Sequence, residues 1–133
     1  MKYLMNLTVL CLLLISTGCA QEETVDNCGE ACSDGVTIET LVNREAKVIK
    51  FYDKGFILTT NKDDFEHEFF IHAEDDYILV PCNWIYSYPH NTKVIVSGKK
   101  TDCCKMLTFP NERRGFGCKF EITSIKPLTV DNE

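Results

Sequence analysis

The sequence predicts an all-β domain of five or six short strands, arranged as a small barrel or sandwich. Short runs rich in β-branched and aromatic residues recur along the chain, and turn-forming residues separate them. No stretch of the domain has a strong helical period of apolar residues. The pattern is clearest at the start, where Ala46–Tyr52 and Phe56–Thr60 flank the turn Asp53-Lys54-Gly55 and predict a hairpin.

Shorter runs predict strands around this hairpin. Residues 36–42 form a β-prone lead-in. The run Glu66–His72 is compatible with a helix or a strand, and we assign it to a strand because the turn-forming Ala73–Asp76 leads from it to a β run, Tyr77–Val80. Pro81 ends that run, since proline has no N–H for the ladder.

The last third of the domain predicts two further strands. Two valines share one face of Lys93–Gly98. The run Lys119–Ile125 alternates apolar with charged or polar residues, and Pro127 ends it. The stretch Cys103–Cys118 contains a proline and two glycines, and it is therefore predicted as a long loop.

The N-terminal residues have the pattern of an export signal. The apolar run from Leu4 to Ile15 is too short to span a bilayer, which takes roughly 18 to 20 apolar residues, and Ser16-Thr17-Gly18 precedes Cys19. This resembles the signal peptide and lipobox of bacterial lipoproteins, with Ser16 where they usually have leucine. The resemblance implies cleavage before Cys19, acylation of that cysteine and binding to membrane lipid. The alternatives are an ordinary signal peptide and a short N-terminal helix.

These features divide the chain into four parts. We expect a signal peptide at 1–18, a lipidated acidic tether at 19–36, the β domain at 37–127 and a C-terminal tail at 128–133. The expected location is the cell envelope, as an outer membrane lipoprotein facing the periplasm or the surface. The net charge of −6, together with export, argues against nucleic acid as a partner.

The cysteines predict disulfides. Of the eight in the chain, Cys11 lies in the leader and Cys19 is the lipid site. An even number remains, which in an exported chain is typical of disulfides: Cys28, Cys32, Cys82, Cys103, Cys104 and Cys118. We expect Cys28 to pair with Cys32, and the other four to form two bridges, one of them joining Cys118 to Cys103 or Cys104.

Aromatic and basic residues form a candidate ligand-binding set: Trp84, Tyr86, Tyr88, Arg113 and Arg114. Rings beside a basic loop are typical of an OB-type face that stacks on bases or sugars. A glycan or an envelope protein is the more natural partner for an exported chain. The alternative is that the same rings cap the end of a small barrel.

No metal site, cofactor site or catalytic site is predicted. His67 and His72 would point to opposite faces of a strand, and so would not share an ion. The chain lacks a nucleophile elbow, an H-E-x-x-H motif, a P-loop and a dinucleotide fingerprint.

Three segments, Tyr77–Asn83, Lys93–Gly98 and Phe120–Ile125, resemble small exported bacterial lipoproteins with an OB-like domain. The shared layout is V-P-x-N, V-x-V-S-G and E-I-T-S-I, within residues 46–127. It implies an OB-like barrel and no particular activity. We therefore expect a membrane-anchored envelope lipoprotein that acts as a non-enzymatic binding or structural module. Glycan binding through the aromatic loop is the alternative, and an envelope enzyme is a third reading.

Overall fold

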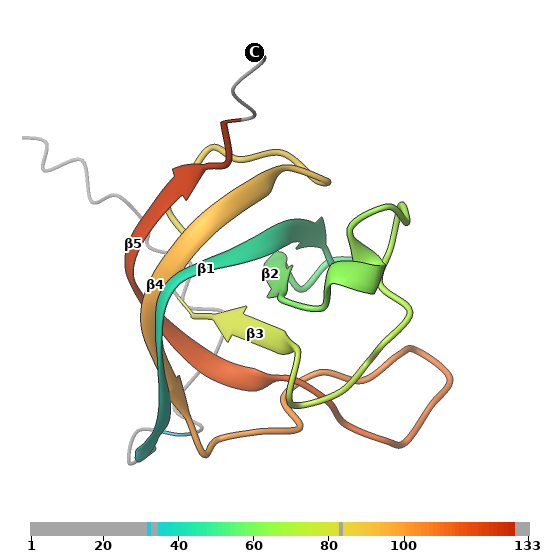
Figure 1. Cartoon of the computed structure of the whole chain (residues 1–133). Helices are drawn as coiled ribbons and strands as arrows, with labels where there is room; N and C mark the ends of the chain where they lie inside the picture. The colour runs from blue at the N-terminus through green and yellow to red at the C-terminus, as the bar shows by residue number, and fades with distance from the viewer. Residues whose placement is uncertain (1–31, 33–34, 83, 130–133) are drawn as a thin grey trace, which may run out of the picture.

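The structure is a computed structural model that describes Cys32, residues 35–82 and residues 84–129. Within these residues the elements are five strands and one 3-10 helix: β1 (Thr37–Lys50), β2 (Phe56–Thr59), η1 (Lys62–Asp64), β3 (Ile78–Pro81), β4 (Lys93–Thr101) and β5 (Cys118–Pro127). The strands form a closed barrel in the order β1-β2-β3-β5-β4 (Figure 1). The prediction of a small all-β, OB-like barrel is therefore confirmed, with five strands. In this part of the chain, no helix is long and apolar enough to cross a bilayer.

Strand β1 closes the barrel because it is long enough to serve two neighbours. Its first part pairs with β4 and its last four residues pair with β2, all antiparallel, while β3 and β5 pair in parallel. The β1–β4 register shifts between Leu41 and Arg44, where Asn43 has a φ of 48°, a left-handed conformation that asparagine tolerates. Its N–H donates to Ser97 Oγ at 2.9 Å. The predicted lead-in and the first predicted strand are thus one bent strand.

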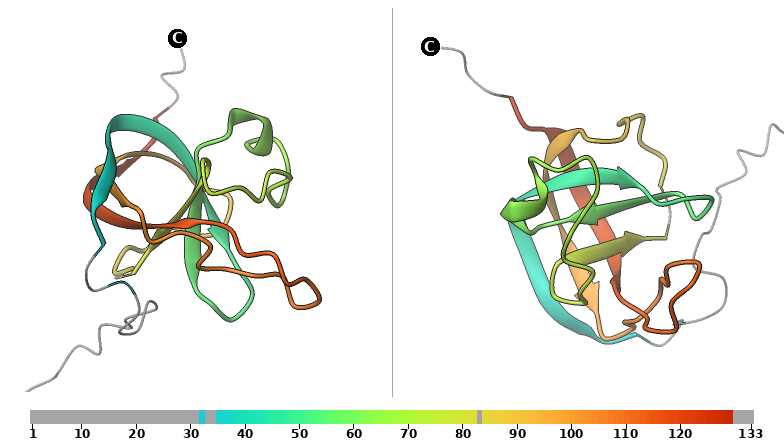
Figure 2. Two further views of the ribbon diagram at one scale, coloured as in Figure 1. Left: turned by 90° about the horizontal axis from the view of Figure 1, so that it is seen from below. Right: turned by 90° about the vertical axis from the view of Figure 1, so that its right-hand side faces the viewer.

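Two apolar cores lie on opposite faces of the strands. The first fills the barrel: Leu41, Ala46, Val48, Leu58, Leu79, Val94, Val96 and Phe120. The second lies outside the barrel and contains Ile49, Phe51, Ile57, Phe70, Ile78, Val80, Cys82, Leu107 and Phe116. It is covered by two segments that extend from the same side of the barrel (Figures 1 and 2), the 60–77 connection and the 102–117 loop. Strands β2 and β3 are almost wholly buried because each has a core on both faces.

The strand predicted at Glu66–His72 is wrong. This segment belongs to the 60–77 connection, which contains η1 and otherwise irregular backbone. The reason is a buried contact from β1: the ammonium group of Lys47 donates to the carbonyl oxygens of Asp64, at 2.7 Å, and of His67. These two carbonyl oxygens are therefore directed at a side chain and not at a neighbouring strand.

The predicted cysteine pairing is wrong in part. Cys104 pairs with Cys118, as one of the two expected options. Cys32 pairs with Cys103 and not with Cys28, because the residues before β1 lie beside the end of β4, where Thr37 pairs with Thr101.

Cys82 was expected to pair with Cys103 or Cys104, and this prediction is also wrong. Cys82 is itself disulfide-bonded, and Cys103 and Cys104 each have another partner. Cys28 and the expected lipidation site Cys19 lie outside the described residues. Cys32 falls in the range expected to be the tether, so its bridge fastens the end of that range to the domain.

Candidate ligand-binding face

The three predicted aromatic side chains lie together on residues 84–92, the aromatic loop that leads from β3 to β4. The Trp84 indole stacks on the Phe56 ring, with centroids 5.6 Å apart and an interplanar angle of 27°. Trp84 also meets Tyr86 edge to face, and Tyr86 stacks on Tyr88. Trp84 and Tyr88 pack against the core inside the barrel, as the capping alternative predicted. The rings remain half-buried, so each retains some surface open to solvent.

Trp84 carries an unsatisfied donor. Its Nε1 atom is buried and has no hydrogen-bond partner in the part of the chain that the structure describes. A buried N–H without an acceptor costs about 1 to 3 kcal/mol, and such groups are few in folded proteins. Among the described residues, the indole is therefore held by ring contacts and core packing, with no hydrogen bond at Nε1.

The Phe56 ring connects the aromatic loop to a groove. The groove has a volume of about 180 Å³ and is lined by Lys54, Phe56, Val80, Pro81, Met106, Leu107 and Thr108. These residues come from the β1–β2 turn, from β2 and β3, and from the 102–117 loop. The face of strands 2 and 3, between the first and last loops, is where OB barrels bind oligonucleotides and oligosaccharides. The groove offers an apolar floor, one aromatic wall, one cation and one hydroxyl.

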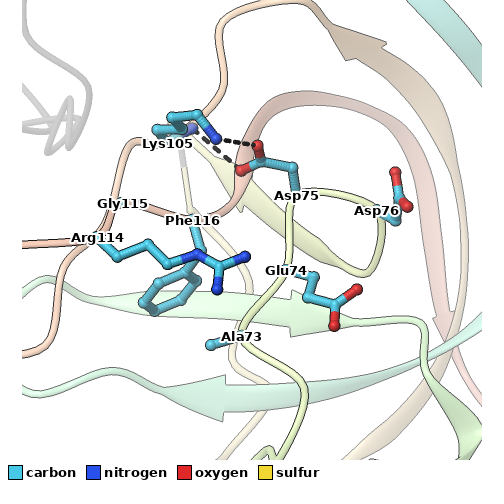
Figure 3. A pocket seen from close by; sticks show the side chains of 8 residues that line it. All are labelled: Ala73, Glu74, Asp75, Asp76, Lys105, Arg114, Gly115 and Phe116. Atoms are coloured by element: carbon cyan, nitrogen blue, oxygen red, sulfur yellow. Dashed lines mark hydrogen bonds and ion pairs between the residues drawn. The ribbon is translucent and has the colours of Figure 1, made fainter.

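A second pocket, of about 240 Å³, is charged, and Figure 3 shows its lining: Ala73, Glu74, Asp75, Asp76, Lys105, Arg114, Gly115 and Phe116. Asp75 accepts from the backbone N–H of Lys105 at 3.2 Å and from its Nζ at 3.1 Å. Arg114, Glu74 and Asp76 form no ion pair among the described residues. Their side chains are exposed, where charge pairs contribute little.

The structure therefore separates the predicted set into two places. Trp84 contacts Phe56, which lines the groove, and Tyr86 and Tyr88 pack against Trp84. Arg114 lines the charged pocket, and Arg113 is exposed on the same loop and lines neither cavity. The sequence analysis missed the groove residues themselves, which come from segments far apart in the chain: Lys54, Phe56, Met106 and Thr108. The one local signal was Phe56, an aromatic residue at the start of a predicted strand.

Within the described residues, a single group of three potential metal ligands comes together: Asp75, Cys104 and Cys118. Both sulfur atoms belong to one disulfide, so neither is a thiolate that binds a metal. Two of the three histidines contact other groups through a ring nitrogen. His72 Nδ1 lies 3.3 Å from Asp64 Oδ1, and His90 Nδ1 accepts from the Lys50 N–H at 2.9 Å.

A buried polar cluster fixes the 60–77 connection to the barrel, next to the second core. The Asp64 carboxylate, fully buried, accepts from Thr59 Oγ1 at 2.7 Å and from the Ile71 N–H at 2.8 Å. Burial lowers the pKa of Lys47 below its ordinary value, and the nearby charge of Asp64 opposes that shift. On the surface, the hydrogen bond and charge of Lys93 lower the pKa of Glu66. The polar groups of the buried cluster thus satisfy one another's hydrogen bonds, and we assign the cluster a structural role.

Comparison of the chain with models of protein families, with curated proteins and with solved structures found no match.

Proposed function

We propose that the chain is an exported, lipid-anchored binding module of the cell envelope, without enzymatic activity. The apolar run that ends in Ser16-Thr17-Gly18 before Cys19 supports the anchor. Disulfides among the later cysteines support an oxidising compartment, since such bridges persist in exported proteins and are rare in the cytosol. In this proposal the acylated Cys19 holds the protein on the outer membrane, facing the periplasm or the surface.

The binding face in this proposal is the groove over β2 and β3. The observation that carries it is the continuity from the groove, through its Phe56 wall, to the Trp84 indole. An apolar floor with a few polar groups at its rim is the usual composition of a small-molecule site. Arg113 and Arg114 lie outside this face.

Among ligands, a glycan or oligosaccharide is favoured by a specific observation, the aromatic wall beside an unsatisfied Trp84 N–H. Sugar rings stack on aromatic side chains and carry oxygen atoms that accept hydrogen bonds. An envelope protein that inserts an apolar side chain into the groove is the other class. Nucleic acid is disfavoured by export and by the acidic net charge of the chain.

The anchor is tested by metabolic labelling of the full chain with a palmitate analogue. We expect labelling of the wild type and its loss in Cys19→Ala. A Cys11→Ser variant, altered within the leader, is the matched control and should keep its label. Labelling that survives Cys19→Ala would remove the anchor from the proposal.

The ligand class is tested on an oligosaccharide array, followed by titration of any binding sugar against the fluorescence of Trp84. Trp84 is the single tryptophan of the chain, and its contact with Phe56 makes its emission a direct reporter on the groove wall. We expect Met106→Asp to abolish binding, because it places a charge on the groove wall, while the surface variant Lys126→Ala binds normally. Equal sugar binding by both variants would show that the ligand binds outside the groove.

A further inference from the structure

The start of β1 presents an apolar surface. Val36, Ile38 and Val42 are 64%, 56% and 72% exposed, whereas Leu41 between them is buried in the barrel at 4%. The other large apolar side chains that are comparably exposed in the described chain lie singly on three different connections: Tyr52, Ile71 and Ile85. Exposed apolar residues scattered singly need no explanation, but a gathered set marks an interaction surface.

This surface lies where the N-terminal segment enters the domain. Cys32 is bonded to Cys103 just after β4. The Val36 N–H donates to Asp102 Oδ1 at 2.9 Å, and the Val36 carbonyl accepts from the Asp102 N–H at 2.9 Å. The entry point is thus fixed to the barrel beside Val36 and Ile38. In Figure 1 this start of β1 lies at the opposite end of the barrel from the end of β5.

Twelve residues lie between Cys19 and Cys32. A chain of that length reaches at most about 45 Å when fully extended. A lipid on Cys19 would therefore keep the start of β1 close to the membrane at all times. A surface held so close needs little affinity of its own, because the tether makes its local concentration high.

We propose that Val36, Ile38 and Val42 form a membrane-contacting surface, which inserts into the interfacial region of the bilayer that holds the acyl chains of Cys19. The inference rests on the lipid anchor proposed above. It adds an orientation: the barrel sits with the start of β1 against the membrane.

A second copy of the chain fits this surface less well. A strand edge recruits another strand through a regular ladder, and the β1–β4 register shifts twice along this stretch, between Thr37 and Glu39 and between Leu41 and Arg44. Such bulges protect edges from pairing. Three side chains also provide far less area than the roughly 1,200 to 2,000 Å² of a stable protein interface. A lipid surface requires neither a regular edge nor a large area.

The test places a fluorescent reporter within the proposed surface of the lipidated full chain. The protein is reconstituted in phosphatidylcholine–phosphatidylglycerol vesicles, and its emission is compared between lipids with brominated acyl chains and lipids without bromine. Ile38→Trp and, as the matched control, Ile71→Trp are made in a Trp84→Phe background. The exposed fraction of Ile71, 59%, is close to the 56% of Ile38. Ile71 lies on a different segment, the 60–77 connection. We expect a blue shift and loss of emission by bromine for Ile38→Trp, and neither for Ile71→Trp. Val42→Trp serves as the second reporter if Ile38→Trp does not fold.

The outcomes separate this inference from its premise. A chain that does not float with the vesicles contradicts the anchor, and with it the inference. A chain that floats while Ile38→Trp and Val42→Trp emit as they do in water overturns the membrane contact and leaves the anchor intact. A blue shift that depends on protein density without bromine quenching would assign the surface to a second copy, and would also overturn the proposal.

Discussion

At the scale of single residues, Lys47 shows how one side chain determines the path of a distant segment. Its ammonium group lies inside the protein, with 1% of the residue exposed, and donates to the carbonyls of Asp64 and His67. Those two carbonyls lie on the 60–77 connection, which covers the second core. Without the donor, the connection would bury carbonyl oxygens that have lost their partner.

We expect Lys47→Met to destabilise the protein by about 1 to 3 kcal/mol, the usual cost of leaving buried polar groups unsatisfied. Urea unfolding at pH 7 measures the change, with the exposed Lys126→Met as the matched control. A loss no larger than that of the control would contradict the role assigned to the ammonium group.

The same variant also predicts a pH dependence. The pKa of Lys47 in the folded protein lies below 10.5, its ordinary value. Between those two values the unfolded chain binds more protons than the folded one, so the contribution of Lys47 to the free energy of unfolding rises with pH. The stability difference between wild type and Lys47→Met should therefore grow as the pH approaches 10.5. A constant or shrinking difference would show that burial does not control this titration.

Residue-level predictions from the sequence succeeded where they depended on local chemistry. The number and context of the later cysteines predicted disulfides, and the five of them that the structure describes are disulfide-bonded. Their partners could not be read from spacing, because the pairing of Cys32 with Cys103 depends on β1 starting beside the end of β4. The role of Trp84 as a ligand contact stays a prediction, and its partner Phe56 and the rest of the groove come together only in the folded chain.

At the scale of elements, Gly98 marks a place where two strands approach too closely for a side chain. It lies at the register shift between β4 and β5. A Cβ at this position would meet the carbonyl oxygen of Glu121, and would come within 2.6 Å of the Phe120 ring. Phe120 belongs to the core inside the barrel, so the two strands and the core all constrain this position.

We expect Gly98→Ala to cost about 1 to 3 kcal/mol, the usual range for overpacking a well-packed site. The neighbouring Lys99→Ala is the control, since Lys99 is exposed and its truncation adds no volume between the strands. Thermal unfolding of the two variants measures the difference. Equal melting temperatures would mean that β5 can move away from β4 at no cost.

The strands themselves were predictable because their signals are local. Alternating apolar residues, β-branched runs and terminal prolines placed all five, and Pro81 and Pro127 are the last residues of β3 and β5. The Glu66–His72 segment was not predictable in this way. Its apolar residues, Phe69 and Phe70, face a core outside the barrel, and that second core has no signature in the sequence.

At the scale of the whole molecule, the disulfides add covalent connections to the closed barrel. One bridge spans 71 residues between Cys32 and Cys103, and another spans 14 between Cys104 and Cys118. Two adjacent residues after β4 thus have different partners: Cys103 is bonded to Cys32, before β1, and Cys104 to Cys118, at the start of β5. A disulfide lowers the conformational entropy of the unfolded chain, and it stabilises the folded state more when the loop that it closes is longer.

We expect the Cys32→Ser/Cys103→Ser variant to lose about 4 kcal/mol and Cys104→Ser/Cys118→Ser about 3 kcal/mol in the chain-entropy model. Denaturant unfolding of both double variants, beside the oxidised wild type, measures these losses. Peptide mapping without reductant confirms which bridges remain. A larger loss from the shorter loop would show that contacts near Cys118, and not chain entropy, dominate.

The bridge between Cys32 and Cys103 also determines how the domain would bear a mechanical load. A pull on the N-terminal segment would otherwise act on the first residues of β1 and peel them from β4, one hydrogen bond at a time. With the bridge in place, the force reaches the ends of β1 and β4 together, because Thr37 and Thr101 are already paired beside it. Peeling of β1 then requires a disulfide to break first. When load is applied through that end, β1 therefore resists peeling for as long as the bond stays oxidised.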